Sequence, residues 1–381
     1  MKNMNKNESF IKKEYGLTGL PFKTKIAIDL ELQSWINREK EMESWNKILE
    51  NAIKIPNSNF FAFIIGDYGL GKTLSLLKIV KEPIKKELYP IYFNMISEQK
   101  PKNPGLDFIL RIIRQIDFDS LKVTKKDIEF IKSVFHDVGN VFEKILFPKD
   151  NNEKILAMAF IKGEIKPNQS QMKLMEVIKK IDDVDIAKEY LTGILHLIKI
   201  SGFSTLVVAV DEFEYLFSLI PKPSQSIYLA LFRGLYDFHV QIPEKLKNVI
   251  ANMAFFFGIS EDGMQRLNEL ENIEKSYGGP IRPLMRRIED KIRLSALDKK
   301  YVRELIEKRL SLNRVKGMYE KEPLIPFTED FVEYIFKLTA GKPAFIIERC
   351  DHVLEKGLVK RAPKLTAEFA IEVFKERGFT Y

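Results

Sequence analysis

The distribution of apolar residues along the chain predicts buried strands that alternate with amphipathic helices. Nearly continuous apolar runs occur at 60–65, 88–97, 206–210 and 249–260, and each has the length of a strand. Runs without polar alternation are typical of central strands that helices cover on both faces. Before the first run, Met42, Trp45, Ile48 and Leu49 recur at helical spacing. This alternation predicts an α/β fold with a parallel sheet.

The interval between the second and third runs contains helical patterns and no comparable strand. We expect helices at about 105–117, 125–138, 140–147, 152–162, 171–180 and 184–201. A structureless connection of this length would be improbable, so we predict a long helical insertion over about 102–200.

The remaining segments complete a prediction of three parts. Residues 1–58 form an entry segment, 59–291 the core with its insertion, and 292–381 a small all-helical lid. The stretch 276–298 reads as a loop, and Arg286 and Arg287 open a helix or its flank. Pro343 suits the first turn of one lid helix, and Thr366 is a possible cap of the last.

Composition narrows the class of protein. The 381 residues are 45% hydrophobic and 30% charged, as in an ordinary globular protein. The apolar runs are too short to span a bilayer, so no membrane partner is expected. The N-terminus has no apolar signal core, and the single cysteine, Cys350, fits a reducing compartment. We therefore expect a cytoplasmic protein.

The net charge of +8 favours contact with a polyanion such as DNA. The lysines are spread along the chain, however, and solvated helix faces are a commoner explanation of such a charge. Charge alone is therefore weak evidence for nucleic-acid binding.

The sequence "GDYGLGKT" between strand 60–65 and the following helix is a P-loop motif in its required context. Glycines let the backbone turn tightly and approach a phosphate, and the N–H groups of the loop and helix start point at the anion. Lys72 would reach the β- and γ-phosphates of ATP, and Thr73 would bind Mg²⁺. The alternatives are a chance glycine turn, or a loop that binds nucleotide without hydrolysing it. The candidate nucleotide-binding residues of the loop are Gly66, Asp67, Tyr68, Gly69, Leu70, Gly71, Lys72, Thr73 and Leu74.

Two adjacent acids, Asp211 and Glu212, end the apolar run "LVVAV". Alone they fit a strand that emerges into water. With a P-loop upstream, they fit a site in which Asp211 binds Mg²⁺ and Glu212 polarises the attacking water. Glu214 is expected to contact a neighbouring element or solvent.

The P-loop, the "VVAVDE" strand, the strand ending in Ser260, the arginine pair and the lid opening with "TAGKPAFIIER" together resemble an AAA+ ATPase. "YGLTGLPF" followed by "INREKEMESW" is similar to the entry segment of the replication-initiator and transposition-helper branch. The insertion ending in "GFSTLVVAVDEFEYLF", followed by "YLALFRGLYDF", looks more specifically like the ATP-binding proteins of BREX phage-defence systems.

The resemblance implies further roles. Ser260 would contact the attacking water or the γ-phosphate, although a plain turn serine is the alternative. Arg286 or Arg287, with Arg286 slightly favoured, would be an arginine finger acting on a neighbouring subunit of a homo-oligomer. A contact with DNA or with a surface acid is the alternative for the pair. The lid pattern G-x-P-R reads Gly-Lys-Pro-Ala here, so Lys342 or Arg349 would have to replace the missing arginine.

Three functions remain open at this point. The first is an ATPase that couples ATP binding and hydrolysis to oligomerisation and to remodelling of nucleic acid or nucleoprotein. The second is a nucleotide-dependent switch or scaffold that recruits protein partners through the insertion 102–200 without acting on DNA. A clamp-loader-like or chaperone-like remodeller ranks last, because no aromatic pore loop is evident.

Overall fold

The computed structural model describes residues 9–23, 28–96, 102–218, 222–277, 279 and 281–376. The chain packs into two compact units. The helical unit comprises Met1–Met42, Gly66–Leu74 and Leu294–Tyr381, and the sheet unit comprises Glu43–Ile65 and Ser75–Arg293. The functional division at residues 58 and 291 remains a prediction.

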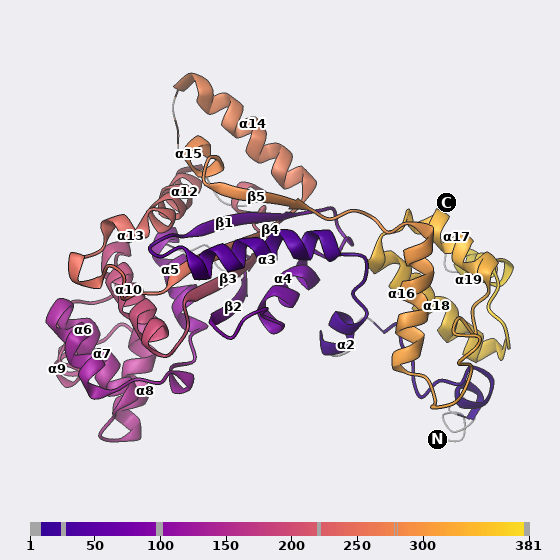
Figure 1. The fold of residues 1–381 in the computed structure, drawn as a ribbon, viewed down its shortest axis with the longest axis horizontal. Coiled ribbons are helices and arrows are strands. Elements are labelled where there is room, and N and C mark those ends of the chain that lie inside the picture. The colour runs from indigo at the N-terminus through magenta and orange to yellow at the C-terminus, as the bar shows by residue number, and fades with distance from the viewer. Residues whose placement is uncertain are drawn as a thin grey trace. The chain divides into compact units, whose positions relative to one another are not determined.

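The sheet unit is built on five parallel strands in the order β2-β3-β4-β1-β5 (Figure 1). The bounds are β1 Phe60–Ile65, β2 Leu88–Asn94, β3 Thr205–Asp211, β4 Asn252–Ile259 and β5 Ile288–Arg293. The α/β fold and the four strands predicted from apolar runs are confirmed.

Every residue of the three central strands, β1, β3 and β4, is buried. Side chains along each strand alternate between the two faces of the sheet. On one face, Phe61, Phe63 and Phe257 belong to a core that also contains residues of α5 (Pro104–Arg114), α10 (Val184–Ile200) and α12 (Lys222–Tyr236). Helices α3 and α4 lie on the opposite face (Figure 1). The bounds are α3 Glu39–Lys54 and α4 Lys72–Lys81. Helices on both faces explain why these strands read as continuous apolar runs.

The predicted helical insertion between β2 and β3 is present. It contains α5 and α10 and, between them, α6 Lys125–Val134, α7 His136–Leu146, α8 Asn151–Ile161 and α9 Gln169–Met175. Local signals set the helix starts, because Thr124 and Asn168 each form a capping box. The nearly buried Lys144 bonds Glu153 at 3.0 Å and Glu176 at 3.1 Å, which ties three segments of the insertion together.

The stretch 276–298, in which glycines and prolines mark a loop, contains a helix and a strand that were not predicted. The chain forms α14 Glu261–Tyr277, α15 Ile281–Met285 and then β5, which pairs with β1. Strand β5 is an edge strand of sequence "IEDKIR", in which Ile288 and Ile292 are the apolar residues. Its charged majority hid it from a search for apolar runs. Arg286 and Arg287 directly follow the last residue of α15, so they flank a helix instead of opening one.

The opposite edge of the sheet is β2, whose third residue is Pro90. Proline has no backbone N–H and is confined within sheets to edges, strand starts and bulges. Its place here agrees with the edge position of β2.

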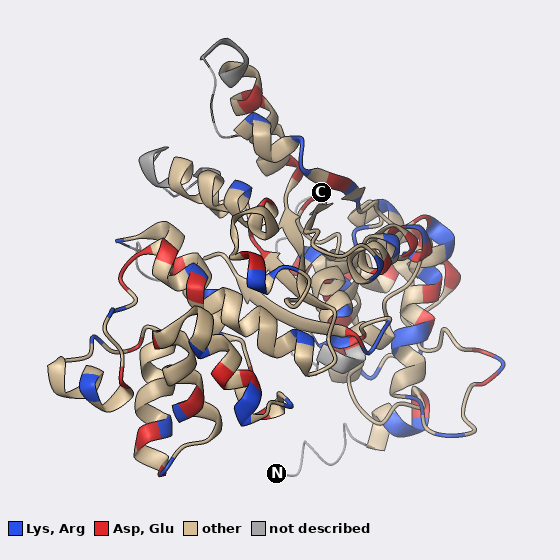
Figure 2. Ribbon diagram, turned by 60° about the vertical axis from the view of Figure 1, so that its left-hand side comes forward, with Lys and Arg blue, Asp and Glu red and all other residues tan. Residues whose placement is uncertain are grey.

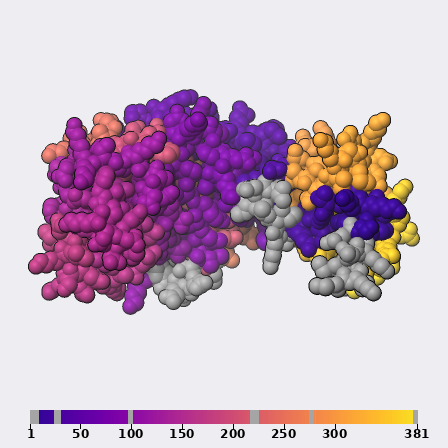
Figure 3. Space-filling model, turned by 90° about the horizontal axis from the view of Figure 1, so that it is seen from below, coloured from indigo at the N-terminus to yellow at the C-terminus, as the bar shows by residue number. Residues whose placement is uncertain are grey.

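The helical unit joins the N-terminal segment to four C-terminal helices: α16 Lys299–Leu312, α17 Glu329–Thr339, α18 Pro343–Lys360 and α19 Ala367–Glu376. Tyr15, Leu17 and Phe22 are fully buried in its core, and the Tyr15 hydroxyl donates to the Ala362 carbonyl at 2.6 Å. Figure 3 shows the N-terminal segment in indigo against these helices. Thr366 caps α19 as predicted, accepting from the Phe369 amide. None of the helices in the described ranges is both long and apolar enough to cross a bilayer.

Candidate nucleotide-binding site

The P-loop connects the end of β1 at Ile65 to the start of α4 at Lys72. Gly69 and Gly71 adopt φ values of +85° and +97°, which favour glycine. A Cβ built on Gly71 would meet no atom within 4 Å, so the backbone there faces open space. The Lys72 ammonium donates to the Gly66 carbonyl at 2.8 Å and so lies along the loop. An open, glycine-lined turn at a helix N-terminus fits a phosphate group.

Residues at the start of α18 contact the same loop within the helical unit. The Ala344 amide donates to the Gly69 carbonyl at 3.1 Å, and Lys342 Nζ lies 3.5 Å from Asp67 Oδ2. Tyr68 and Phe345 place their ring centroids 5.9 Å apart. Lys342 is thus the lid cation that this structure brings to the P-loop.

Arg349, the other candidate to replace the missing lid arginine, has different partners. Its guanidinium lies 5.7 Å from the centroid of the Phe374 ring, and it pairs with Glu348 at 3.5 Å. A nucleotide contact by Arg349 in place of Lys342 stays a prediction.

Arg38 is a residue of this site that the sequence did not reveal. Its side chain is buried and donates to the carbonyls of Leu70, at 3.1 Å, and Ser295, at 2.7 Å. Glu41 pairs with it at 3.1 Å. Burial lowers the pKa of Arg38, and the adjacent Glu41 opposes that shift. Arg38 therefore ties the P-loop to the segment that precedes α16.

A small cavity of about 40 Å³ adjoins the P-loop within the helical unit. Trp35, Leu70 and Ile347 contribute to its mainly apolar lining. Arg309 also lines it, and Nε of this buried side chain has no hydrogen-bond partner among the described residues. Arg309 is anchored by Glu31 and the Pro21 carbonyl. The slot is apolar with one unpaired donor, but its volume is well below the roughly 300–1,000 Å³ of typical ligand pockets, so a planar base would enter only if the slot widened.

The predicted acids occupy the end of β3 in the sheet unit. Asp211 is 2% exposed, and its Oδ2 accepts a hydrogen bond of 3.0 Å from the Tyr92 hydroxyl on β2. Asp211 Oδ1 accepts from the Glu212 amide at 2.9 Å. A Cβ on Gly258 would lie 2.9 Å from that oxygen, so glycine leaves room for the carboxylate. Glu212 adopts φ +55°, a left-handed conformation that costs free energy in a residue other than glycine.

Ser260 follows β4, the neighbour of β3. Its hydroxyl accepts from the Gly263 amide at 3.0 Å and caps α14, while its own amide donates to Glu214 Oε1 at 3.2 Å. Parallel strands run in the same direction, so their carboxyl-terminal ends lie side by side. The structure therefore brings Asp211, Glu212 and Ser260 to the carboxyl-terminal ends of β3 and β4.

The arginine pair lies at the amino-terminal end of the edge strand β5. Arg286 and Arg287 precede β5, whose first residue, Ile288, pairs with Phe61 near the start of β1. Arg287 forms a two-point ion pair with Asp237, at 2.6 and 3.2 Å, and covers the Tyr236 ring. Arg286 is exposed. Arg287 is thus paired with Asp237, and within the described residues neither arginine forms an ion pair with Asp211 or Glu212 of its own chain.

Several solved structures resemble this chain at low sequence identity, and the first supports the same fold. The ADP form of the ORC2 protein of Aeropyrum pernix is 14% identical, with a TM-score of 0.52 over 94% of this chain and 73% of that chain. Drosophila ORC bound to DNA is 13% identical, with a TM-score of 0.43 over 100% of this chain and 75% of the other. A RuvB structure of Thermotoga maritima is 13% identical, with a TM-score of 0.42 over 93% and 73%. Identities this low concern the fold alone.

No curated protein matches the chain. The model of the family described as BREX system ATP-binding protein BrxC/D matches residues 126–344, more than half of the chain. The match begins after the P-loop and includes Asp211, Glu212 and the α18 start. The chain therefore belongs to the BREX system ATP-binding protein family BrxC/D and has an AAA+ P-loop fold.

Proposed function

We propose that this protein hydrolyses ATP and couples the cycle to oligomerisation and to remodelling of nucleic acid or nucleoprotein. The observation that carries the proposal is the P-loop, an open glycine turn that runs from a buried strand into a helix N-terminus. Membership of an ATP-binding family agrees with it. Hydrolysis, assembly and DNA contact are each open to experiment.

The residues of the P-loop would bind the phosphates. Lys72 would exchange its hydrogen bond to Gly66 for phosphate oxygens, and the loop amides would donate to them. Thr73 and Asp211 would hold Mg²⁺, and their oxygen donors fit the preference of that ion. When bound, Mg²⁺ neutralises phosphate charge. Trp35 and Arg309 would receive the adenine.

Glu212 would accept a proton from the attacking water on its carboxylate. Its left-handed backbone and the Asp211 bond to its amide fix the direction in which the side chain leaves the strand. Ser260 would bind the water or the γ-phosphate, because its hydroxyl still has a proton to donate while it accepts from Gly263.

The arrangement of the arginine pair supports action between copies of the chain. Arg286 is exposed at the amino-terminal end of β5, whereas Asp211 and Glu212 lie at the carboxyl-terminal end of β3. Its proposed target is therefore the nucleotide of another copy of the chain. We propose Arg286 as the finger and Arg287 as its support, because Asp237 and Tyr236 already engage Arg287. This role requires a homo-oligomer.

The case for nucleic acid rests on the net charge of +8. Figure 2 shows basic and acidic residues interspersed on the same helices, which predicts a modest, salt-sensitive contact. The test is the ATPase rate with and without duplex DNA at low and high salt. The wild type should be stimulated at low salt, and Glu212→Gln should lose about 100-fold in rate at unchanged ATP affinity. Full activity in Glu212→Gln would remove the general-base assignment.

A protein scaffold is the second candidate function, and exposed apolar side chains on the insertion favour it. Ile155 on α8 and Leu174 on α9 are more than half exposed, as is Ile178 after α9. If the protein is a scaffold, we expect it to capture partner proteins in an ATP-dependent manner, and this capture should not depend on DNA. Changing these three residues to serine should abolish capture; capture that persists would sink this alternative.

A further inference from the structure

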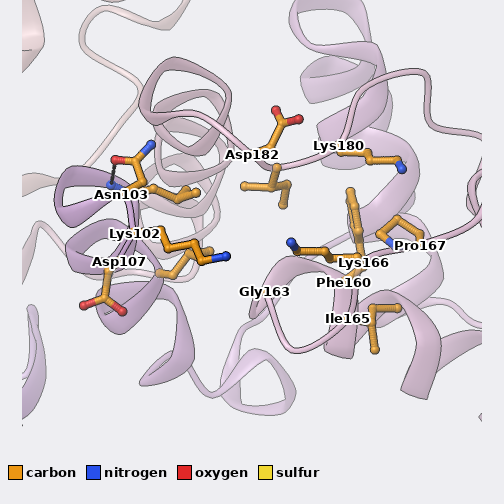
Figure 4. A pocket seen from close by; sticks show the side chains of 13 residues that line it. Lys102, Asn103, Asp107, Phe160, Gly163, Ile165, Lys166, Pro167, Lys180 and Asp182 are labelled. Atoms are coloured by element: carbon orange, nitrogen blue, oxygen red, sulfur yellow. Dashed lines mark hydrogen bonds between the residues drawn. The ribbon is translucent and has the colours of Figure 1, made fainter. Parts of the chain in front are cut away.

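A cavity of about 570 Å³ lies in the insertion of the sheet unit. Its walls come from the start of α5, the turn that follows α8 and the segment that precedes α10 (Figure 4). This volume is typical of small-molecule pockets, which measure about 300–1,000 Å³. The residues named for ATP do not line it.

The inner wall of the cavity is apolar. Leu106 and Leu110 on α5, Phe160 on α8, and Ile165 and Ile181 from the flanking segments line it. Such a wall would exclude water from the body of a bound molecule and so favour an apolar or aromatic group.

Close packing holds the walls in place. Gly163 has φ +68°, and a Cβ there would lie 2.6 Å from a methyl carbon of Leu110. A Cβ on Gly105 would lie 2.9 Å from Val184, so the starts of α5 and α10 are in close contact. The cavity is therefore bounded by packed helices and a tight turn.

Three lysines, Lys102, Lys166 and Lys180, line the mouth and are exposed. None of them forms an ion pair with another residue in the described ranges. Figure 4 shows Lys102 and Lys166 reaching into the same hollow from opposite sides. Two ammonium groups that converge without a partner suit a doubly charged anion.

The acids near the mouth do not neutralise these lysines. Asp107 accepts a 2.7 Å bond from Arg111, and Asp182 points away from Lys102 and Lys166 in Figure 4. The N-terminus of α5, capped by Asn103, borders the hollow and adds positive potential.

We propose that this cavity binds a small organic phosphate, with its apolar or aromatic body against Leu106 and Phe160 and its phosphate between Lys102 and Lys166. The site is separate from the P-loop residues. It gives the insertion a ligand of its own, in addition to any protein partner.

Pyridoxal 5′-phosphate is a suitable probe, because it carries a phosphate on an aromatic ring and an aldehyde that reacts with lysine. The aldehyde carbon and the lysine Nζ condense with loss of water, and added borohydride delivers hydride to the imine carbon. Peptide mass spectrometry then reports the labelling rate of each lysine. The phosphate of this probe would bind one of the two converging lysines and place the aldehyde within reach of the other, so Lys102 and Lys166 should react about tenfold faster than the exposed Lys86 and Lys173, the gain expected from one charge-assisted hydrogen bond.

Two controls separate recognition from plain reactivity. Pyridoxal, which lacks the phosphate, should show no preference among the four lysines. Leu106→Trp should fill the cavity and remove the preference, whereas Leu174→Trp, on the exposed face of α9, should keep it. Circular dichroism verifies that both variants fold. Equal labelling of all four lysines, equal preference with pyridoxal, or a preference that survives in Leu106→Trp would overturn the proposal.

Discussion

The hydroxyl of Tyr92 on β2 donates a 3.0 Å hydrogen bond to Oδ2 of Asp211, the last residue of the neighbouring strand β3. Burial and the adjacent carboxylate raise the pKa of Tyr92, so its phenol remains a donor at neutral pH. With Oδ1 held by the Glu212 amide, each Asp211 oxygen has a fixed orientation. Such supporting hydrogen bonds orient a metal-binding carboxylate.

Tyr92→Phe should therefore weaken the response to Mg²⁺ while preserving the fold. We expect the Mg²⁺ concentration for half-maximal ATPase activity to rise about tenfold. Tyr89→Phe is the matched control on the same strand, because the Tyr89 hydroxyl bonds Asp117 instead. Superimposable Mg²⁺ titrations of Tyr92→Phe and wild type would contradict the positioning role.

Arg38→Ala should destabilise the helical unit and weaken ATP binding. The substitution leaves the Leu70 and Ser295 carbonyls without their donor, at a cost of about 3 kcal/mol in the free energy of unfolding. Arg38→Lys should restore less than half of this, because an ammonium lacks the planar fork. Urea unfolding and ATP titration measure both effects.

The control for Arg38 is Arg303→Ala. Arg303 is a partly exposed cation that pairs with Glu307 and Glu329, and its loss should cost less than about 1 kcal/mol. Equal destabilisation by the two alanine variants would refute the special role of Arg38.

Substitution of Arg286 should affect mainly the ATPase rate, and substitution of Arg287 mainly the stability. Arg286→Ala should lower the ATPase rate by about 10³-fold with little change in unfolding. Arg287→Ala should lower the free energy of unfolding by about 2 kcal/mol, because Asp237 loses its ion pair.

Mixing two inactive variants tests whether the finger acts between chains. Arg286→Ala retains its acids and Glu212→Gln retains its finger, so mixed oligomers should recover part of the activity. A mixture as inactive as its components would argue against action on a neighbouring copy.

Because His239 on α13 (Phe238–Gln241) is buried, we expect the free energy of unfolding to fall in mild acid. Burial lowers its pKa to about 4, and neither ring nitrogen has a partner in the described part of the chain. The unfolded chain, with a pKa near 6.5, therefore binds more protons than the native state between pH 6.5 and 4. The contribution of His239 is complete above pH 6.5, and about 3 kcal/mol of it is lost as the pH falls to 4.

Unfolding of wild type and His239→Phe across this range isolates the effect. The variant should lose less stability between pH 6.5 and 4, while the exposed His136→Phe should follow the wild type. Parallel curves for wild type and His239→Phe would show that the buried ring does not titrate in this range.

The sequence predicted those parts of the molecule that local patterns determine. Strand β1, the loop after it and the acids of β3 follow from apolar runs and adjacent glycines or carboxylates. Strand β5 was missed because edge position allows "IEDKIR" to be mostly charged. Arg38 was missed for another reason, since its partner Ser295 lies 257 residues away and only folding reveals that contact.

The same distinction applies to the arginine pair. Sequence could name two adjacent arginines but could not separate them, because their difference lies in Asp237, a residue 50 positions away. Tyr92 likewise gives no sign in "LYPIYFN" of the carboxylate 119 residues later. Tertiary partners, rather than local propensities, decide these roles.

The two margins of the sheet bear on how copies of this chain can associate. Pro90 removes one backbone donor from the β2 edge, and Glu289, Lys291 and Arg293 place a charged, exposed side chain at every second position of β5. Both features discourage another strand from continuing the hydrogen-bond ladder. Crowded chains are thus protected against edge-to-edge aggregation, and any functional assembly must use side-chain surfaces instead of a shared sheet.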